Sequence, residues 1–173
     1  MISNKAASLA QMNGAFNGTI ANGLLHISLF KGVMPSMDKV FDNMYPVAVD
    51  GLLNWRTCCT QLGLVQADHL GDVTFPTMNI SVNANSRTVT LPLYATGAQL
   101  VGAVSGTPTF YVARIIGVGT VAAWLGFNYN ANITGAFWIG TVGPEGSDAE
   151  LQFIGGEIEA GQKYTFRDLM LQL

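Results

Sequence analysis

The stretch from Gly135 to Leu173, GAFWIGTVGPEGSDAELQFIGGEIEAGQKYTFRDLMLQL, gives the clearest indication of fold class. Apolar runs at Ala136–Val142, Ala149–Ile154 and Lys163–Leu173 are separated by Gly, Pro, Asp and Ser, the residues that favour turns. Short apolar runs between dense turn signals are typical of antiparallel β-structure. We therefore expect these three runs to be the closing meander of a β-sandwich.

Alternation within the runs supports strands. Leu151 and Phe153 share one parity, and the polar residues between and before them share the other, as in a half-buried strand. In the last run, Tyr164 and Phe166 have one parity and the leucines from Leu169 onward have the opposite one. We interpret the slip at Arg167–Asp168 as a β-bulge within a single final strand, with Phe166 facing the core.

Further strands are expected upstream. They are Leu24–Phe30, Asp72–Val82, Arg87–Tyr94, Pro108–Ile116 and Thr120–Phe127, with a hairpin turn at Asn83–Ser86 joining the second and third. Pro76 marks an edge or a bulge, because proline cannot donate a ladder hydrogen bond. The segments 95–106 and 128–134 are rich in small or polar residues and are expected to be loops, and 65–71 a connection.

Polar residues occur within two of these strands. In Leu24–Phe30 the aliphatic residues share one face, and His26 and Ser28 share the other, which we expect to be the outward polar face. In Pro108–Ile116 a single Arg114 shares its parity with Phe110 and Val112.

One or two short helices are expected beside the strands. Val47–Leu64 fits a helix with Asp50 as its N-cap and Gly63 at its C-terminus, although Trp55–Thr60 would also suit a strand. Ser36 can cap a second short helix over Met37–Met44. Together these patterns predict a mainly β protein: an antiparallel, jelly-roll-like β-sandwich of seven or eight strands, formed by residues 21–173 after an N-terminal arm or short helix at 1–20.

The composition narrows the function classes. The 173 residues are 49% hydrophobic but only 11% charged, with a net charge of −3, against roughly 25% charged residues in ordinary domains. The absence of a basic cluster argues against nucleic-acid binding, and no apolar run reaches the length of a membrane span. A surface this poor in charge favours self-association or a subunit of an assembly, so we expect a homo-oligomer. The N-terminal residues do not resemble a signal peptide, which predicts synthesis in the cytoplasm.

Motifs for catalysis or cofactor binding are not evident. The glycines of 140–146 and 117–119 lack the Lys-Ser/Thr or third glycine of phosphate-binding loops. The adjacent Cys58 and Cys59 are expected to be reduced, partly buried side chains, and His26 and His69 sit in no zinc-ligand spacing. We therefore expect no enzyme activity, no cofactor and no metal.

The sequence also leaves open two binding functions, of calcium and of sugars. Acidic residues gather in the last third, at Glu145, Asp148, Glu150, Glu157 and Glu159, and oxygen ligands of this kind suit calcium, although the spacing of an EF-hand is missing. The tryptophans at 55, 124 and 138 are scattered, which favours core or interface positions over a sugar-binding platform.

Three pieces of the sequence resemble a known group. They are ISLFKGVMPS at Ile27–Ser36, FYVARI at Phe110–Ile115, and the stretch from Gly135, where GTVG precedes the strand AELQF and IEAGQ leads into the last strand. In this order they resemble small proteins encoded among the structural genes of tailed bacteriophages. Val47–Leu64 and Val118–Thr134 depart from that pattern.

The resemblance implies a β-sandwich structural subunit of the virion and carries over no catalytic residue. The expected function is a capsid decoration (cement) protein that contacts other virion proteins, such as the major capsid protein. The alternatives are a tail, collar or baseplate component, or, from a different class, a carbohydrate-binding β-sandwich module.

Overall fold

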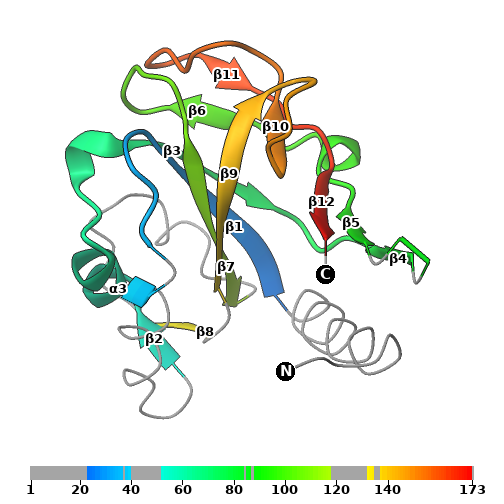
Figure 1. The fold of residues 1–173 in the computed structure, drawn as a ribbon, viewed down its shortest axis with the longest axis horizontal. Helices are drawn as coiled ribbons and strands as arrows, with labels where there is room; N and C mark the ends of the chain where they lie inside the picture. Colours follow the sequence, from blue (N-terminus) through cyan, green and yellow to red (C-terminus); the bar gives the residue numbers. More distant parts are fainter. Residues whose placement is uncertain are drawn as a thin grey trace.

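The structure is a computed structural model that describes residues 23–36, 38–39, 52–83, 85–86, 88–117, 132–134 and 137–172. It is mainly β, with a curved seven-stranded sheet, a three-stranded sheet beside it and a two-stranded ribbon (Figure 1). This confirms the predicted fold class, although the described residues form twelve strands and not the seven or eight expected. In the described part of the chain, no helix has the length and apolar character needed to cross a membrane.

The strands contain two to eight residues and are numbered along the chain, but their spatial order in the sheets differs from their order in the chain. Those of the seven-stranded sheet, in spatial order, are β10 (Leu151–Phe153), β9 (Phe137–Pro144), β7 (Phe110–Gly117), β1 (Gly23–Phe30), β3 (His69–Phe75), β6 (Leu100–Gly102) and β11 (Lys163–Tyr164). The three-stranded sheet contains β12 (Leu169–Gln172), β5 (Thr88–Leu91) and β4 (Ser81–Asn83), and the ribbon pairs β2 (Leu52–Asn54) with β8 (Asn132–Thr134). Among the described residues, the helical elements are α3 (Trp55–Leu62), the 3-10 turns η1 (Gln66–Asp68) and η2 (Tyr94–Thr96), and the two helical residues 38–39.

The seven-stranded sheet nearly closes on itself. The residues that follow its edge strand β11 form hydrogen bonds with the other edge strand, β10, and the residue after it. The Ile154 amide donates to the Thr165 carbonyl at 3.0 Å, and the Arg167 amide donates to the Gln152 carbonyl at 2.8 Å. An almost closed sheet hides most of its edge hydrogen-bonding groups. All but one of its strand pairs are antiparallel, and the exception is the parallel pair of β9 and β10.

One continuous core joins the inner face of this sheet to the three-stranded sheet, as in a sandwich. The predicted inward aliphatic residues of β1, Leu25, Ile27 and Leu29, are all at most 1% exposed. The core members from the remaining strands and turns are Leu70, Val73, Phe75, Val89, Leu91, Leu93, Leu100, Tyr111, Ala113, Val142, Leu151, Phe153, Ile158, Phe166 and Leu169. The burial of Leu151, Phe153 and Phe166 confirms the inward face predicted for the last third.

The predicted helix within Val47–Leu64 is confirmed over Trp55–Leu62. Cys59 and Leu62 are each 2% exposed. The helix ends at Gly63, whose positive φ of 74° allows the Leu64 amide to reach back to the Cys59 carbonyl at 2.9 Å. The alternative prediction, a strand over Trp55–Thr60, is wrong, and the short strand β2 lies just before the helix at residues 52–54.

The prediction of a single closing strand is wrong. Lys163–Leu173 contains two strands, β11 and β12, which belong to different sheets. The parity slip at Arg167–Asp168 is the place where the chain crosses from one sheet to the other, and not a bulge. The last third is also not a meander, because β10 is parallel to β9 and the two final strands pair with β6 and β5.

The same kind of crossing occurs upstream. β3 ends at Phe75, and the chain passes Pro76 before entering β4 in the other sheet, so Asp72–Val82 is two strands and not one. The expected hairpin does form, between β4 and β5. Two expected loops contain strands: β6 lies within 95–106, and β8 lies within 128–134.

Several predictions fall outside the described residues. These are the arm at 1–20, the strand at Thr120–Phe127, the N-cap at Asp50 and most of the helix at Met37–Met44. Of that helix only 38–39 are described, and the Lys39 amide lies 3.4 Å from the Ser36 hydroxyl, as the predicted cap requires.

Gly102 gives a first testable prediction. A β-carbon there would overlap the Glu159 carbonyl oxygen and lie 2.9 Å from Ile158 Cγ2. The Glu159 carbonyl cannot easily move, because the same backbone segment is fixed by hydrogen bonds from the Gly102 amide to the Gln162 carbonyl and from the Gly161 amide to the Gly102 carbonyl. We therefore expect Gly102→Ala to lower the free energy of unfolding by about 1–3 kcal/mol in urea titrations. The control Gly156→Ala meets no atom within 4 Å and should change stability little. Equal stability of the two variants would contradict this close packing.

Candidate functional site

A buried polar cluster lies on the face of the seven-stranded sheet opposite the core. His26 and Arg114 are 0% exposed, Ser28 is 1% exposed and His69 is 6% exposed. The prediction that His26 and Ser28 face away from the core residues of β1 is correct, but the prediction that this face is outward is wrong. The sheet is therefore buried on both sides along β1.

The register of three adjacent strands brings the cluster together. Ser28 on β1 lies beside Asp72 on β3, and His26 on β1 lies between Thr74 on β3 and Arg114 on β7. Residues directly opposite on neighbouring strands have side chains about 5 Å apart. The pairing of the strands thus brings Ser28 into contact with Asp72, 44 residues away in the sequence, and with Arg114, 86 residues away.

Asp72 is the centre of the cluster. Its side chain is 7% exposed, and its Oδ1 lies 3.0 Å from His69 Nε2 and 3.4 Å from His26 Nε2. Ser28 donates its hydroxyl proton to the same carboxylate and accepts a hydrogen bond of 2.8 Å from Arg114 Nη1. Ser28 therefore bridges a buried carboxylate and a buried guanidinium.

These contacts shift two pKa values. Burial alone would raise the pKa of Asp72, but hydrogen bonds from His26 and His69 hold it well below its usual range. Burial lowers the pKa of His26, and the nearby charge of Arg114 lowers it further, against the opposing effect of Asp72. At neutral pH the cluster accordingly holds an ionised Asp72 beside a neutral His26.

The arrangement does not fit nucleophilic catalysis. A catalytic serine needs a base strong enough to take its proton, whereas Ser28 donates to a carboxylate whose pKa is held well below its usual range, and it also accepts from Arg114. The serine is also almost fully buried. We interpret the cluster as a structural network that fixes the register of β1, β3 and β7.

The low pKa of His26 predicts acid sensitivity. In the unfolded chain this histidine takes up a proton as the pH falls through 6.5, whereas the folded protein resists protonation. The free energy of unfolding should therefore decrease as the pH falls from about 6.5 towards 5. Urea titrations of the parent and of His26→Gln across this range test the expectation. The variant should show a shallower decrease, and identical slopes would contradict the assignment to His26.

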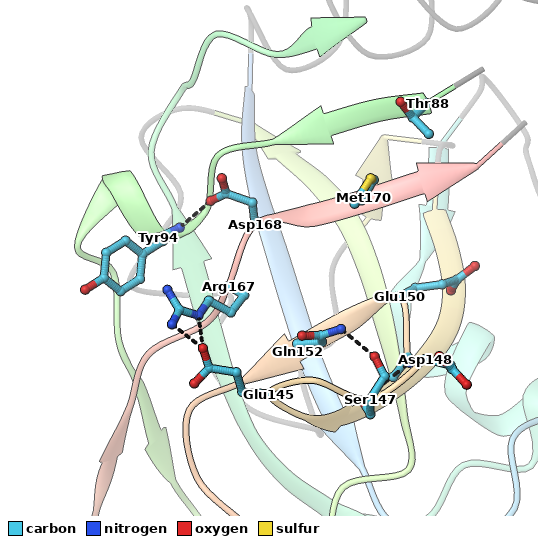
Figure 2. A pocket seen from close by; sticks show the side chains of 11 residues that line it. Thr88, Tyr94, Glu145, Ser147, Asp148, Glu150, Gln152, Arg167, Asp168 and Met170 are labelled. Atoms are coloured by element: carbon cyan, nitrogen blue, oxygen red, sulfur yellow. Dashed lines mark hydrogen bonds and ion pairs between the residues drawn. The ribbon is translucent and has the colours of Figure 1, made fainter. Parts of the chain in front are cut away.

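A second candidate site is an open surface hollow of about 690 Å³. Figure 2 shows its residues converging from η2, β12, β10 and the turn after β9. The lining residues are Thr88, Tyr94, Glu145, Ser147, Asp148, Ala149, Glu150, Gln152, Arg167, Asp168 and Met170. The volume lies within the range of small-ligand and peptide sites.

Side chains at one end of the hollow are tied to one another (Figure 2). Arg167 Nε donates to Glu145 Oε1 at 2.8 Å, and its guanidinium lies 5.4 Å from the centre of the Tyr94 ring. Asp168 accepts from the Tyr94 amide at 3.1 Å. Gln152 uses both ends of its amide on the turn, accepting from Gly146 and donating to the Ser147 carbonyl. Because Arg167 and Glu145 are both exposed, their ion pair contributes little stability.

Glu150 connects the hollow to the core. Its carboxylate lies beside the buried phenol of Tyr111, and burial together with this carboxylate raises the pKa of Tyr111. Gly140 of β9 is the pairing partner of Tyr111 of β7, and its lack of a side chain leaves room for the Glu150 carboxylate and the Tyr111 phenol. A β-carbon at this position would overlap the carboxylate and lie 2.8 Å from the phenol oxygen.

The structure separates the acidic residues that the sequence groups. Glu145, Asp148 and Glu150 line the hollow with Asp168, whereas Glu157 and Glu159 do not. Within the described residues, no three acidic, histidine or cysteine side chains converge as metal ligands would. Cys59 is a buried free thiol, and the side chain of Cys58 lies outside the described part.

Sequence reasoning missed both sites. The signal for the buried cluster was present, since His26, Ser28 and Arg114 each interrupt an apolar strand. Alternation shows which side chains share a face but not whether that face is covered. The hollow joins residues from Thr88 to Met170 and had no local signal.

Comparison of the chain with family models, curated proteins and solved structures gave no match.

Proposed function

We propose that this protein is a structural subunit of a bacteriophage virion, with decoration of the capsid as its role. The proposal begins from the sequence resemblance described above. Support from the structure comes from the mainly β fold and from an exposed apolar surface at one end of the sheet, which carries the proposal.

That surface, the apolar loop end, consists of Val33, Met34, Val65 and Val104. Their exposed fractions are 93%, 40%, 50% and 38%. They belong to three loops, which follow β1, precede η1 and follow β6, and which lie together at the upper left of Figure 1.

Hydrogen bonds hold these loops together. The Lys31 amide donates to the Asp68 carbonyl at 2.9 Å, and the Thr109 hydroxyl donates to the Gly32 carbonyl at 2.8 Å. The Ala103 amide donates to the Leu70 carbonyl at 2.7 Å. Exposed apolar side chains on loops that hydrogen bonds already hold in place suit a contact surface, because binding a partner then costs little conformational entropy of the loops.

The low content of charged residues also supports a subunit of an assembly. With 11% charged residues, the surface has little electrostatic repulsion to keep copies or partners apart. In a virion, where each subunit meets many neighbours, such a surface supports tight packing. The proposed partners are other virion proteins and further copies of this chain.

The test is gold-labelled antibody against this protein on intact particles of the phage that encodes it. Label distributed over the head is the expected result. Label confined to the tail would overturn the capsid role and favour a tail, collar or baseplate subunit. Absence of label, together with absence of the protein from purified particles by mass spectrometry, would overturn the virion proposal.

A further inference from the structure

The hollow begins where β10 and the segment leading into β12 stop forming hydrogen bonds with each other. The bond from the Arg167 amide to the Gln152 carbonyl is the last rung between β10 and the chain that approaches β12. Beyond Asp168 the chain enters β12, which pairs with β5 alone within the described residues. One edge of β12 therefore presents backbone groups without a neighbouring strand in this part of the structure.

The open edge borders the hollow. Met170 of β12 lines it from one side and Ser147–Glu150 from the other, with Gln152 of β10 at the closed end (Figure 2). Met170 is 56% exposed, an unusual position for a large apolar side chain next to an open strand edge. Edges of this kind are ready templates for another strand.

The charge around this edge is mostly negative. Glu145, Asp148, Glu150 and Asp168 line the hollow, and Arg167 is its one cation. Arg167 is already paired with Glu145, and the Glu150 carboxylate lies beside Tyr111. The exposed Asp148 is the carboxylate best placed to receive a new cationic group.

We propose that the hollow receives an extended segment of a partner protein, which adds as a strand along β12 and carries Lys or Arg at alternate positions. Main-chain hydrogen bonds would supply affinity, and the carboxylates would select basic side chains. At about 3.3 Å per residue, the four residues of β12 match a segment of similar length. This proposal does not depend on the virion role.

A saccharide fits less well. Sugar hydroxyls need several free planar polar groups, but Gln152 and Arg167 are already engaged within the hollow. The Tyr94 ring, the only aromatic residue in the lining, already carries the Arg167 guanidinium. An open edge of backbone groups suits a peptide better than a sugar.

The experiment uses isotopically labelled full-length protein and the blocked peptide acetyl-Lys-Val-Lys-Val-Lys-Val-amide. In NMR titrations we expect saturable shifts of the β12 amides, with a Kd below about 1 mM that weakens as salt increases. A second peptide, N-methylated at alternate amides, keeps the charge but cannot form the ladder. Its affinity should be at least about tenfold lower.

Two variants locate the charge effect. Asp148→Lys should abolish the shifts, whereas Asp38→Lys, an equal charge change at an exposed residue that does not line the hollow, should leave them unchanged. Equal binding of the methylated peptide would mean charge attraction alone and would overturn strand addition. So would the absence of shifts in β12, or saturable binding of maltotriose at the hollow in place of the peptide.

Discussion

Replacing Phe166 by Asp is expected to unfold the protein at room temperature. Phe166 is 1% exposed, packs edge-to-face on Phe75 with ring centres 5.9 Å apart, and bridges to Phe153. Removing a buried phenylalanine side chain costs about 3–5 kcal/mol, and burying a carboxylate among apolar groups adds several more. The sum approaches the entire stability of a typical domain, about 5–15 kcal/mol.

Circular dichroism and amide dispersion in NMR spectra would measure this loss. Phe166→Leu keeps an apolar side chain and should cost about 1 kcal/mol. Met170→Asp makes a similar change four positions later at a 56% exposed site and should alter stability by at most about 0.5 kcal/mol. A folded Phe166→Asp protein with the melting temperature of the parent would show that the segment between β11 and β12 does not close the core.

The last third illustrates how far alternation predicts this fold. It identified the inward residues Leu151, Phe153 and Phe166, because a side-chain period of two depends only on an extended backbone and one buried face. It could not identify the partner of each strand. The parity changes near Pro76 and Arg167 carry the missing information, since in this fold each marks the passage of the chain from one sheet to the other.

The candidate sites were less predictable for a related reason. The sequence correctly places His26 and Ser28 on the face of β1 opposite its aliphatic residues. Whether that face is buried depends on what packs over it, which the alternation of side chains does not show. Asp72 and His69 were not expected beside them, because strand pairing and not spacing brings β1, β3 and β7 together. The hollow depends on where β10 and β12 part, which is a property of the tertiary structure.

The buried cluster should be the second most sensitive place in the molecule. Asp72→Asn preserves the shape of the side chain but removes the negative charge that faces Arg114 across Ser28, bonds His69 and lies 3.4 Å from His26 Nε2. Breaking a buried ionic arrangement from one side costs about 3–5 kcal/mol, because the opposite charge stays buried. Urea titrations should show this loss, whereas the exposed control Asp148→Asn should be near neutral.

The double variant Asp72→Asn, Arg114→Met separates charge from shape. If the cost of Asp72→Asn arises from the charge left on Arg114, then removing that charge as well should recover much of the stability, because buried ionic groups often contribute little over apolar ones of similar volume. If the double variant is instead as unstable as the two single losses combined, the contribution of Asp72 comes from its hydrogen bonds to Ser28 and His69. Either result gives the coupling energy across Ser28, and a value near zero would show that Asp72 and Arg114 act independently.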